Sequence, residues 1–354
     1  MSVRQRQAGT DRRVVDLAAR LRVGLVGAGW FATRRHLPNL QSHSQVDLVA
    51  ICRRDQEKLG LIADHFNIPG RYRDFDDMLH SERLDAVVIA TPHSLHYPQA
   101  KVALDRGLHV LLEKPMTLRA REAEALVEKA AEGNHVLSVA LNPPYWPHTR
   151  YARDLIGEGT IGQVEGISIQ WIGNSEGVFG LAPLPDEMPG LVKPSLYRGD
   201  HALSGGGHLM DTGSHLISEF LWLSRMRPVK VAAQMDDTKL DMRIGLQVCL
   251  SGDVHAGINC VGNSSFDGRR IRNVYYGTKG TLTIEGLPFS VTIDLQGRGS
   301  IQKLENEMDE APGPVEDFVL AINEGREPAS TGRHGADVVR VLEAAYRSAE
   351  SVWK

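Results

Sequence analysis

The chain has 354 residues, of which 42% are hydrophobic and 24% charged, a composition typical of a globular protein with about two domains. Its 40 basic and 44 acidic residues give a net charge of −4, so no basic excess is present for binding nucleic acid or an anionic membrane. These values exclude a disordered chain, a fibre and a small disulfide-rich scaffold.

The first third of the chain alternates short apolar segments with helical patterns. After an expected tail at residues 1–20, with a short helix at residues 14–21, strands are expected at residues 22–26, 47–52, 86–90, 109–112 and 136–141. Helices are expected between them at residues 31–41, 56–67, 95–106 and 118–132. Strands and helices alternating at this spacing predict βαβ units. The fold class is therefore α/β, with an N-terminal Rossmann domain, a doubly wound parallel sheet, over residues 21–142.

The pattern changes after residue 142. A helix is expected at residues 147–159, and period-two segments predict strands at residues 164–172, 229–234, 244–250, 256–260, 271–276, 281–284 and 291–295. Further helices are expected at residues 209–224, 315–324 and 335–353, and residues 175–207 form a long Pro- and Gly-rich stretch. This pattern predicts a C-terminal α+β domain over residues 143–354, with an open, mostly antiparallel sheet.

A GxGxxA fingerprint lies between the first expected strand and the first helix. In Gly27-Ala28-Gly29-Trp30-Phe31-Ala32, the first glycine permits a tight turn and the second lets the backbone approach a pyrophosphate. The small Ala32 allows the helix to pack closely on the strand, and the free N–H groups at the helix N-terminus face the phosphates. The segment predicts a dinucleotide-binding site, with a glycine-rich turn that holds no ligand as the alternative.

The end of the second strand indicates which dinucleotide is bound. A carboxylate there would bind a ribose 2′-hydroxyl, but this chain has Arg53 and Arg54, followed by Asp55. Two guanidinium groups favour the 2′-phosphate of NADP, because they form bidentate, charge-assisted hydrogen bonds. NADP is the preferred cofactor and NAD the alternative. In that alternative the arginines form a solvated loop, or Asp55 supplies the ribose contact.

Several short motifs, taken together with their order along the chain, identify a family. They are Gly27-Ala28-Gly29 with His36-Leu37-Pro38, Thr91-Pro92 with His96, Gly107-Leu108-His109-Val110 before Glu113-Lys114-Pro115, Ile161-Gly162-Gln163-Val164, Gly205-Gly206-Gly207 with Asp211, Gly213 and His215, and Gly277-Thr278-Lys279-Gly280. The chain resembles the Gfo/Idh/MocA oxidoreductases, the family of glucose–fructose oxidoreductase and inositol dehydrogenase, from about residue 22 to residue 352. Residue 144 departs from the pattern, because Pro144 stands where many members have an arginine.

The resemblance implies a two-domain enzyme with a nicotinamide dinucleotide bound between the domains. A hydride would pass to or from a carbinol carbon, usually of a sugar, inositol or related polyol. It implies a catalytic set of Lys114, Asp211 and His215. It also implies a homodimer or homotetramer that assembles through the C-terminal sheet.

Further contacts are expected on both sides of this cleft. Cofactor contacts are expected from Gly27, Gly29, Trp30, Phe31, Arg53, Arg54, Thr91, Pro92, His93, His96, Glu113, Lys114 and Asn142. Substrate contacts are expected from Tyr145, Trp171, Tyr197, Arg198, Asp211 and His215, where core packing is the alternative for Tyr145 and Trp171. His93 and His96 have no third ligand nearby in sequence, so no metal site is expected.

The three catalytic candidates fit the oxidation of an alcohol. Lys114 follows a parallel strand, at the edge where doubly wound sheets bind ligands. Asp211 and His215 are four residues apart on one helix face. Either Lys114 or His215 can take the hydroxyl proton, since burial or a nearby cation lowers a lysine pKa and histidine titrates near neutrality. The residues do not decide between the two.

The expected activity is therefore an NAD(P)-dependent sugar or polyol dehydrogenase or reductase. Two alternatives remain: a dehydrogenase of a glycoside ring hydroxyl, of the 3-position type, and a non-catalytic dinucleotide-sensing regulator. The three cysteines lack CxxC spacing, and neither a secretory signal nor an apolar run of about 18 residues is present. We therefore expect a cytoplasmic protein with a small-molecule substrate and neither nucleic-acid nor membrane partners.

Overall fold

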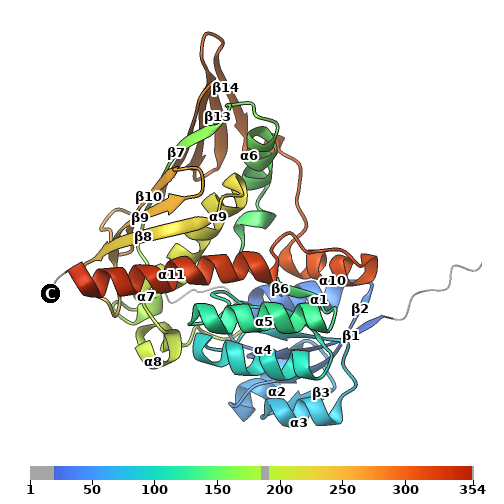
Figure 1. Ribbon diagram of the computed structural model, residues 1–354. Coiled ribbons are helices and arrows are strands. Elements are labelled where there is room, and N and C mark those ends of the chain that lie inside the picture. Colours follow the sequence, from blue (N-terminus) through green and yellow to red (C-terminus); the bar gives the residue numbers. More distant parts are fainter. Residues whose placement is uncertain (1–19, 185–190, 353–354) are drawn as a thin grey trace, which may run out of the picture.

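The computed structural model describes residues 20–184 and 191–352, which form two β-sheets joined by helices (Figure 1). The expected tail and most of its short helix lie outside the described residues. In the described part of the chain, no helix is both long enough and apolar enough to cross a bilayer. The fold is α/β, as the sequence predicts.

The first sheet has six parallel strands in the order β3-β2-β1-β4-β5-β6. The strands are β1 (Leu21–Val26), β2 (Val46–Cys52), β3 (Gly70–Tyr72), β4 (Ala86–Ile89), β5 (His109–Leu112) and β6 (Leu137–Val139). The order reverses between β1 and β4, which opens a crevice at the carboxyl ends of these two strands. The fingerprint Gly27-Ala28-Gly29 lies directly after β1 at this reversal.

Helices cover both faces of the first sheet because its strands are apolar on both sides. One face packs against α3 (Phe75–Ser81), α4 (His96–Asp105) and α5 (Ala120–Glu132). The other face packs against α1 (Leu37–Ser42), α2 (Gln56–His65) and α10 (Pro314–Glu324). In β4, Val87 belongs to the first cluster and Val88 to the second, as expected when side chains alternate along a strand.

The second sheet has eight strands in the order β14-β13-β12-β11-β7-β10-β9-β8. They are β7 (Val164–Ile172), β8 (Pro228–Met235), β9 (Arg243–Leu250), β10 (His255–Val261), β11 (Arg270–Gly277), β12 (Gly280–Gly286), β13 (Ser290–Leu295) and β14 (Gly299–Leu304). All neighbours are antiparallel except β7 and β10. In β9 the buried residues Ile244, Leu246 and Val248 alternate with exposed ones, so one face is packed and the other is open.

The packed face carries α6 (Pro147–Gly157), α9 (Ser214–Ser224) and α11 (Gly332–Val352). Helix α11 crosses the junction of the two sheets and contacts α5 and β6 on one side and β8 and α9 on the other (Figure 1). One apolar cluster therefore runs continuously from the first sheet into the second. A boundary at residue 142 divides the strands between two sheets, whereas α10, late in the chain, returns to the first sheet.

Short elements account for the differences from the expected pattern. Strand β3, helix α3 and strand β14 were not predicted, and the 175–207 stretch contains the four-residue helices α7 (Glu176–Phe179) and α8 (His201–Ser204). Two predicted helices begin as π-helical turns, at Ala32–His36 before α1 and at Leu209–Gly213 before α9. Both turns lie at the site described next.

Candidate active site

A cavity of about 870 Å³ lies where the carboxyl ends of the first sheet face the second sheet. Residues from both sheets and from the 191–204 segment line it. Among the predicted contact residues, its wall includes Gly27, Gly29, Trp30, Phe31, Arg53, Arg54, Thr91, Pro92, Glu113, Lys114, Asn142, Trp171, Tyr197, Arg198, Asp211 and His215. The cavity size fits a dinucleotide or cofactor site.

The turn after β1 has the geometry of a phosphate cradle. Gly27 has a φ of +85°, and a Cβ there would lie 2.5 Å from the Ala90 carbonyl, so only glycine fits. A Cβ on Gly29 would meet nothing nearer than the Gly27 oxygen at 3.8 Å, so this backbone is open on its cavity side. The next residue, Trp30, begins the helix that continues into α1. Free N–H groups at such an N-terminus suit a pyrophosphate.

Three arginines line the cavity at the carboxyl ends of β2 and β3. Arg53 donates from Nη1 to the Ala28 carbonyl, while its Nε is buried without a partner, and burial lowers its pKa. Arg54 and Arg73 are exposed on the same rim, with Arg73 Nε donating to the Arg54 carbonyl at 3.3 Å. A half-buried guanidinium with an unpaired Nε donor is stabilised by an anion, so the residues present fit a 2′-phosphate.

Asp55 is engaged in capping α2. One carboxylate oxygen accepts from the Lys58 backbone N–H at 3.0 Å, and the other forms an ion pair with the Lys58 ammonium at 2.8 Å. N-cap carboxylates of this kind satisfy a free helix donor. For Asp55 to bind a ribose hydroxyl instead, its contacts with Lys58 would have to break.

The Glu113-Lys114-Pro115 motif is fixed by the first helix. His36 Nε2 lies 2.7 Å from Glu113 Oε1, and Glu113 Oε2 accepts from the Lys114 backbone N–H at 3.1 Å. Burial opposes ionisation of Glu113, but the hydrogen bond with His36 leads the contributions that lower its pKa. The Lys114–Pro115 peptide is cis. Glu113 therefore holds the backbone from which Lys114 extends into the cavity.

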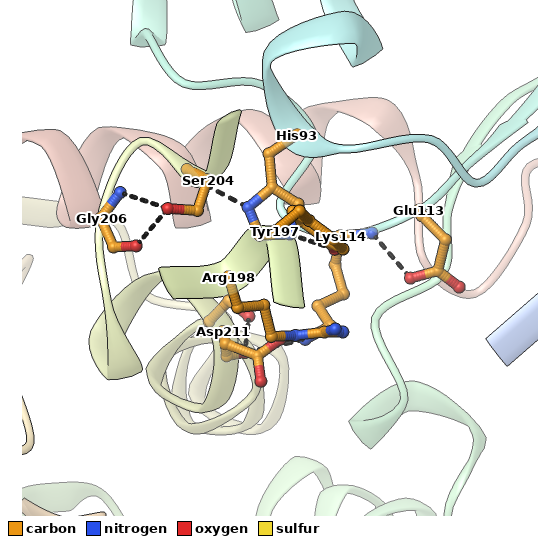
Figure 2. A network of polar contacts seen from close by, with 9 residues as sticks. His93, Glu113, Lys114, Tyr197, Arg198, Ser204, Gly206 and Asp211 are labelled. Carbon is orange, nitrogen blue, oxygen red and sulfur yellow. Dashed lines mark hydrogen bonds and ion pairs between the residues drawn. The ribbon is translucent and has the colours of Figure 1, made fainter. Parts of the chain in front are cut away.

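Lys114 and Arg198 converge on the carboxylate of Asp211 (Figure 2). Lys114 Nζ lies 2.6 Å and Arg198 Nε 3.0 Å from the same oxygen, Asp211 Oδ1, and Lys114 also donates to the Asp211 carbonyl at 3.0 Å. Burial would raise the pKa of Asp211, but the charges of Arg198 and Lys114 hold it well below its ordinary value. Asp211 is thus an ionised anchor for two cations from different parts of the chain.

The glycine triplet before Asp211 allows close packing against Asp241. A Cβ on Gly207 would lie 2.1 Å from the Leu240 carbonyl, and the Gly207 N–H donates to Asp241 at 2.9 Å. The hydroxyl of Tyr346 on α11 donates to the same carboxylate at 2.7 Å. These bonds fix the start of the π-helical turn that carries Asp211.

His215 lies one turn after Asp211, with its ring beside Trp146 at a centroid distance of 6.3 Å. Burial, followed by the charge of Lys114, lowers the pKa of His215 to about 3. Its Nδ1 is buried without a hydrogen-bond partner. At neutral pH the ring is therefore neutral and can accept a hydrogen bond beside Lys114.

Three predicted contact residues lie behind the cavity wall. His96 bonds with the carbonyls of Pro115 and Thr91, and Tyr145 donates to Asp317 on α10. His93 lies 2.9 Å from the Ser204 carbonyl through Nδ1 and 3.1 Å from the Tyr197 hydroxyl through Nε2 (Figure 2). Because a carbonyl only accepts, Nδ1 carries the proton and Nε2 accepts from Tyr197. His93 therefore orients Tyr197, which does line the cavity, and next to the buried Tyr145 it is Trp146 that lines the cavity.

The cavity wall also includes residues that the motifs did not indicate. They include Arg73 and Gln99 on the first-sheet side, and Trp146, Glu219, Arg269, Asn273 and Phe289 on the second-sheet side. One signal was available, because Glu219 continues the four-residue spacing of Asp211 and His215. No group of three or more metal-ligating side chains occurs among residues 20–184 and 191–352.

Replacing Glu219 by Gln is expected to stabilise the protein at alkaline pH. Burial raises the pKa of Glu219 from its ordinary 4.5 to about 7. The folded state therefore binds more protons between these values, and stability falls as pH rises through this window. The variant removes that penalty, so it should gain roughly 1–3 kcal/mol at about pH 8 and little near pH 5.

Thermal unfolding of both proteins across this pH range checks the prediction. Glu128→Gln, an exposed position on α5, is the matched control and should track the wild type at every pH. A Glu219→Gln difference that is constant with pH would contradict the raised pKa.

Comparison with known proteins places these features in a family. Residues 21–141 match the GFO/IDH/MocA family described as "Oxidoreductase family, NAD-binding Rossmann fold". Residues 149–283 match the family described as "GFO/IDH/MocA C-terminal domain". The two matches follow each other along the chain and cover the elements that build both walls of the cavity.

Individual relatives extend over nearly the whole chain. The chain is 27% identical to the D-xylose 1-dehydrogenase (NADP(+)) of Haloarcula marismortui, with 98% of this chain and 94% of the relative covered. It is 28% identical to the dTDP-3,4-didehydro-2,6-dideoxy-alpha-D-glucose 3-reductase of Streptomyces antibioticus, over 93% and 96% of the two chains. The solved aldose–aldose oxidoreductase of Caulobacter crescentus, complexed with glycerol, superimposes with a TM-score of 0.77 at 25% identity, covering 94% of this chain and 98% of that one.

Proposed function

Since this chain belongs to the GFO/IDH/MocA family of NAD(P)-dependent oxidoreductases, we propose that its substrate is a sugar, inositol or related polyol, oxidised or formed at a carbinol carbon. The observation that carries the proposal is the convergence of Lys114, which follows β5, and Asp211, on the turn before α9, with neutral His215 on one wall of the cavity. The three relatives described above are named for reactions of sugars.

The fingerprint turn and the arginine rim would hold the dinucleotide. The Gly29 backbone and the helix N-terminus at Trp30 face its pyrophosphate, and Arg53, Arg54 and Arg73 surround its adenosine end. When bound, the nicotinamide supplies hydride acceptance or donation. The arginines support NADP as the preferred cofactor over NAD, and the Haloarcula relative is named for NADP(+).

The chain's own residues would manage the proton of the reacting hydroxyl. The ammonium of Lys114, positioned by Asp211, can donate a hydrogen bond to an oxygen on which negative charge develops. His215 is neutral and has a buried ring nitrogen, Nδ1, without a hydrogen-bond partner, which supports it as a partner of the reacting hydroxyl in the dehydrogenase direction. Lys114 is the other candidate for that proton, but only in its uncharged amine form, because an ammonium has no acceptor. Asp211 is a positioning residue, because it acts by fixing Lys114 and Arg198.

A glycoside is the second candidate substrate. Tyr197 and Arg198 come from the 191–204 segment, which reaches into the cavity from outside both sheets. Because loops on a rigid scaffold carry recognition, this segment would contact the part of a substrate beyond the reacting ring. A larger substrate oxidised at a ring hydroxyl would use these contacts more fully than a free sugar.

The open face of the second sheet is the proposed assembly surface. Ser168, Gln247 and Asn259 alternate with buried residues there and are exposed in the single chain. A homodimer or homotetramer through this face would cover them. We further propose a cytoplasmic location, in keeping with unpaired Cys52, Cys249 and Cys260. Light scattering of the purified protein measures the assembly.

A substrate panel tests the proposed activity. The purified protein is mixed with NADP(+) or NAD(+) and with D-xylose, D-glucose, myo-inositol or a methyl glucoside, and the absorbance of the reduced nicotinamide is followed. We expect turnover of at least one compound, faster with NADP(+). Turnover of the glucoside alone would select the second candidate. Absence of turnover with every compound and both cofactors would contradict the proposal.

A further inference from the structure

A buried carboxyl group lies one helical turn beyond His215 on the substrate side of the cavity. Glu219 is only 3% exposed, yet it lines the cavity. Its Oε1 accepts from Asn273 Nδ2 at 2.8 Å and from the Tyr275 hydroxyl at 3.1 Å, both on β11. A glutamate side chain is rarely buried so completely unless its carboxyl group is paired with other polar groups.

The second oxygen of this carboxyl group faces the cavity. Oε2 takes part in none of the hydrogen bonds that hold Glu219. Unlike the fully buried polar atoms that have no hydrogen-bond partner, Oε2 retains some exposed surface. Because the residue lines the cavity, the little exposed surface that Glu219 retains is at the cavity. Asn273 and Tyr275 therefore fix one oxygen of Glu219 and leave the other free for a ligand.

The surroundings of Glu219 suit a sugar ring. Trp146 lies beside His215 and, at 6.2 Å between ring centroids, stacks with Phe289, so an aromatic wall adjoins the catalytic helix. Aromatic faces pack against the C–H face of a sugar, while a few fixed polar groups bind its hydroxyls. A carboxylate accepts from a hydroxyl, and a protonated carboxyl group both donates and accepts, so either form of Glu219 complements a hydroxyl.

We propose that Glu219, positioned by Asn273 and Tyr275, is a hydroxyl-binding subsite that selects substrates with a second hydroxyl across the ring from the reacting carbinol. Four residues of helix separate it from His215 by about 6 Å along the axis, within the span of one sugar ring. The substrate class is thereby narrowed to polyhydroxylated rings, and simple secondary alcohols are excluded. This inference rests on the proposed function.

The energetic reason for this selectivity is the cost of an unpaired buried group. A substrate without the second hydroxyl would displace water from Glu219 and leave its free oxygen unsatisfied. Sites built to hydrogen-bond a hydroxyl discriminate strongly against analogues that lack it. The effect should appear in kcat/KM for one particular hydroxyl of the substrate and for no other.

Deoxy analogues combined with a Glu219 variant test the subsite. The fastest of D-glucose, D-xylose and myo-inositol is chosen as the parent, and kcat/KM is measured for it and for its monodeoxy analogues. In the wild type, kcat/KM should be at least tenfold lower for one analogue that retains the reacting hydroxyl than for the parent. In Glu219→Leu, kcat/KM for the parent should fall at least tenfold, while kcat/KM for that same analogue should stay close to its wild-type value.

Ser218→Ala is the matched control. Ser218 is the preceding residue on α9 and bonds with His334 outside the cavity, so it should discriminate among the analogues as the wild type does. If Glu219→Leu does not fold, Glu219→Gln is measured instead. Its kcat/KM should fall at least threefold for the parent and stay unchanged for that analogue. Equal losses on the parent and on every analogue would overturn the subsite while leaving the proposed function intact. No wild-type turnover of any probe would overturn both.

Discussion

Replacing Lys114 by Ala is expected to lower kcat by roughly 10²–10⁴-fold, the usual contribution of a positioned proton-transfer group. The variant removes the ammonium that lies 2.6 Å from Asp211 Oδ1 and faces the cavity. The phosphate cradle and the arginine rim are untouched, so the Kd for NADPH should stay within a few-fold of the wild type. Steady-state kinetics and calorimetric titration measure the two effects separately.

Two further variants show what Lys114 contributes. Lys101→Ala is the control, because it removes an exposed lysine that pairs only with Asp105 on α4, and it should be fully active. Lys114→Arg keeps the positive charge but holds its proton at any working pH. Recovery of turnover in Lys114→Arg would assign Lys114 an electrostatic role and leave His215 as the proton acceptor. Near-normal turnover in Lys114→Ala would contradict either role.

Replacing Arg54 by Asp is expected to shift the ratio of NADPH to NADH affinity at least tenfold toward NADH. Each charge-assisted bond to a phosphate contributes about 1.5–3 kcal/mol, and a new carboxylate adds repulsion. Arg54 is exposed on the cavity rim, and its guanidinium forms no hydrogen bond or ion pair with the residues that the structure describes. The Kd values for both reduced cofactors, measured by calorimetry, give the ratio directly.

Arg53→Asp tests the same contact with a different side effect. Arg53 also donates to the Ala28 carbonyl in the fingerprint turn, so its loss should weaken both cofactors as well as change their ratio. Arg71→Asp is the control, since Arg71 pairs with Asp64 and does not line the cavity. A ratio that is unchanged in both Arg53→Asp and Arg54→Asp would show that these arginines do not read the 2′-phosphate.

The fold was predictable where the sequence has a strong period. Apart from the short helix expected at residues 14–21, most of which lies outside the described residues, the expected strands and helices all have counterparts. Buried strands such as Ala86–Ile89 are continuously apolar, and amphipathic helices such as α5 bury one face. Strand β3 and helix α3 were missed because three and seven residues are too few to establish a period. The return of α10 to the first sheet depends on packing between segments that are distant in sequence. A local sequence pattern does not predict such packing.

The site was predictable from motifs and less so from single aromatic residues. Lys114, Asp211 and His215 line one cavity because each follows or begins an element whose position the fold determines. By contrast, Tyr145 and Trp146 are neighbours in a short helical turn, and only the backbone conformation decides which ring enters the cavity. Arg73 and Asn273 reach the site through strand pairing with distant segments. Glu219 could have been predicted, since it repeats the four-residue spacing of Asp211 and His215.

The transfer of a labelled hydride tests the account most directly. The wild type is mixed with NADP(+) and with D-glucose, D-xylose or myo-inositol that is fully deuterated on carbon, and the reduced cofactor is analysed by mass spectrometry. If the cavity binds a polyol carbinol against the nicotinamide, the NADPH formed carries one deuterium derived from the substrate carbon. Reduced cofactor without deuterium, or no reduced cofactor with any of the three, would contradict the account.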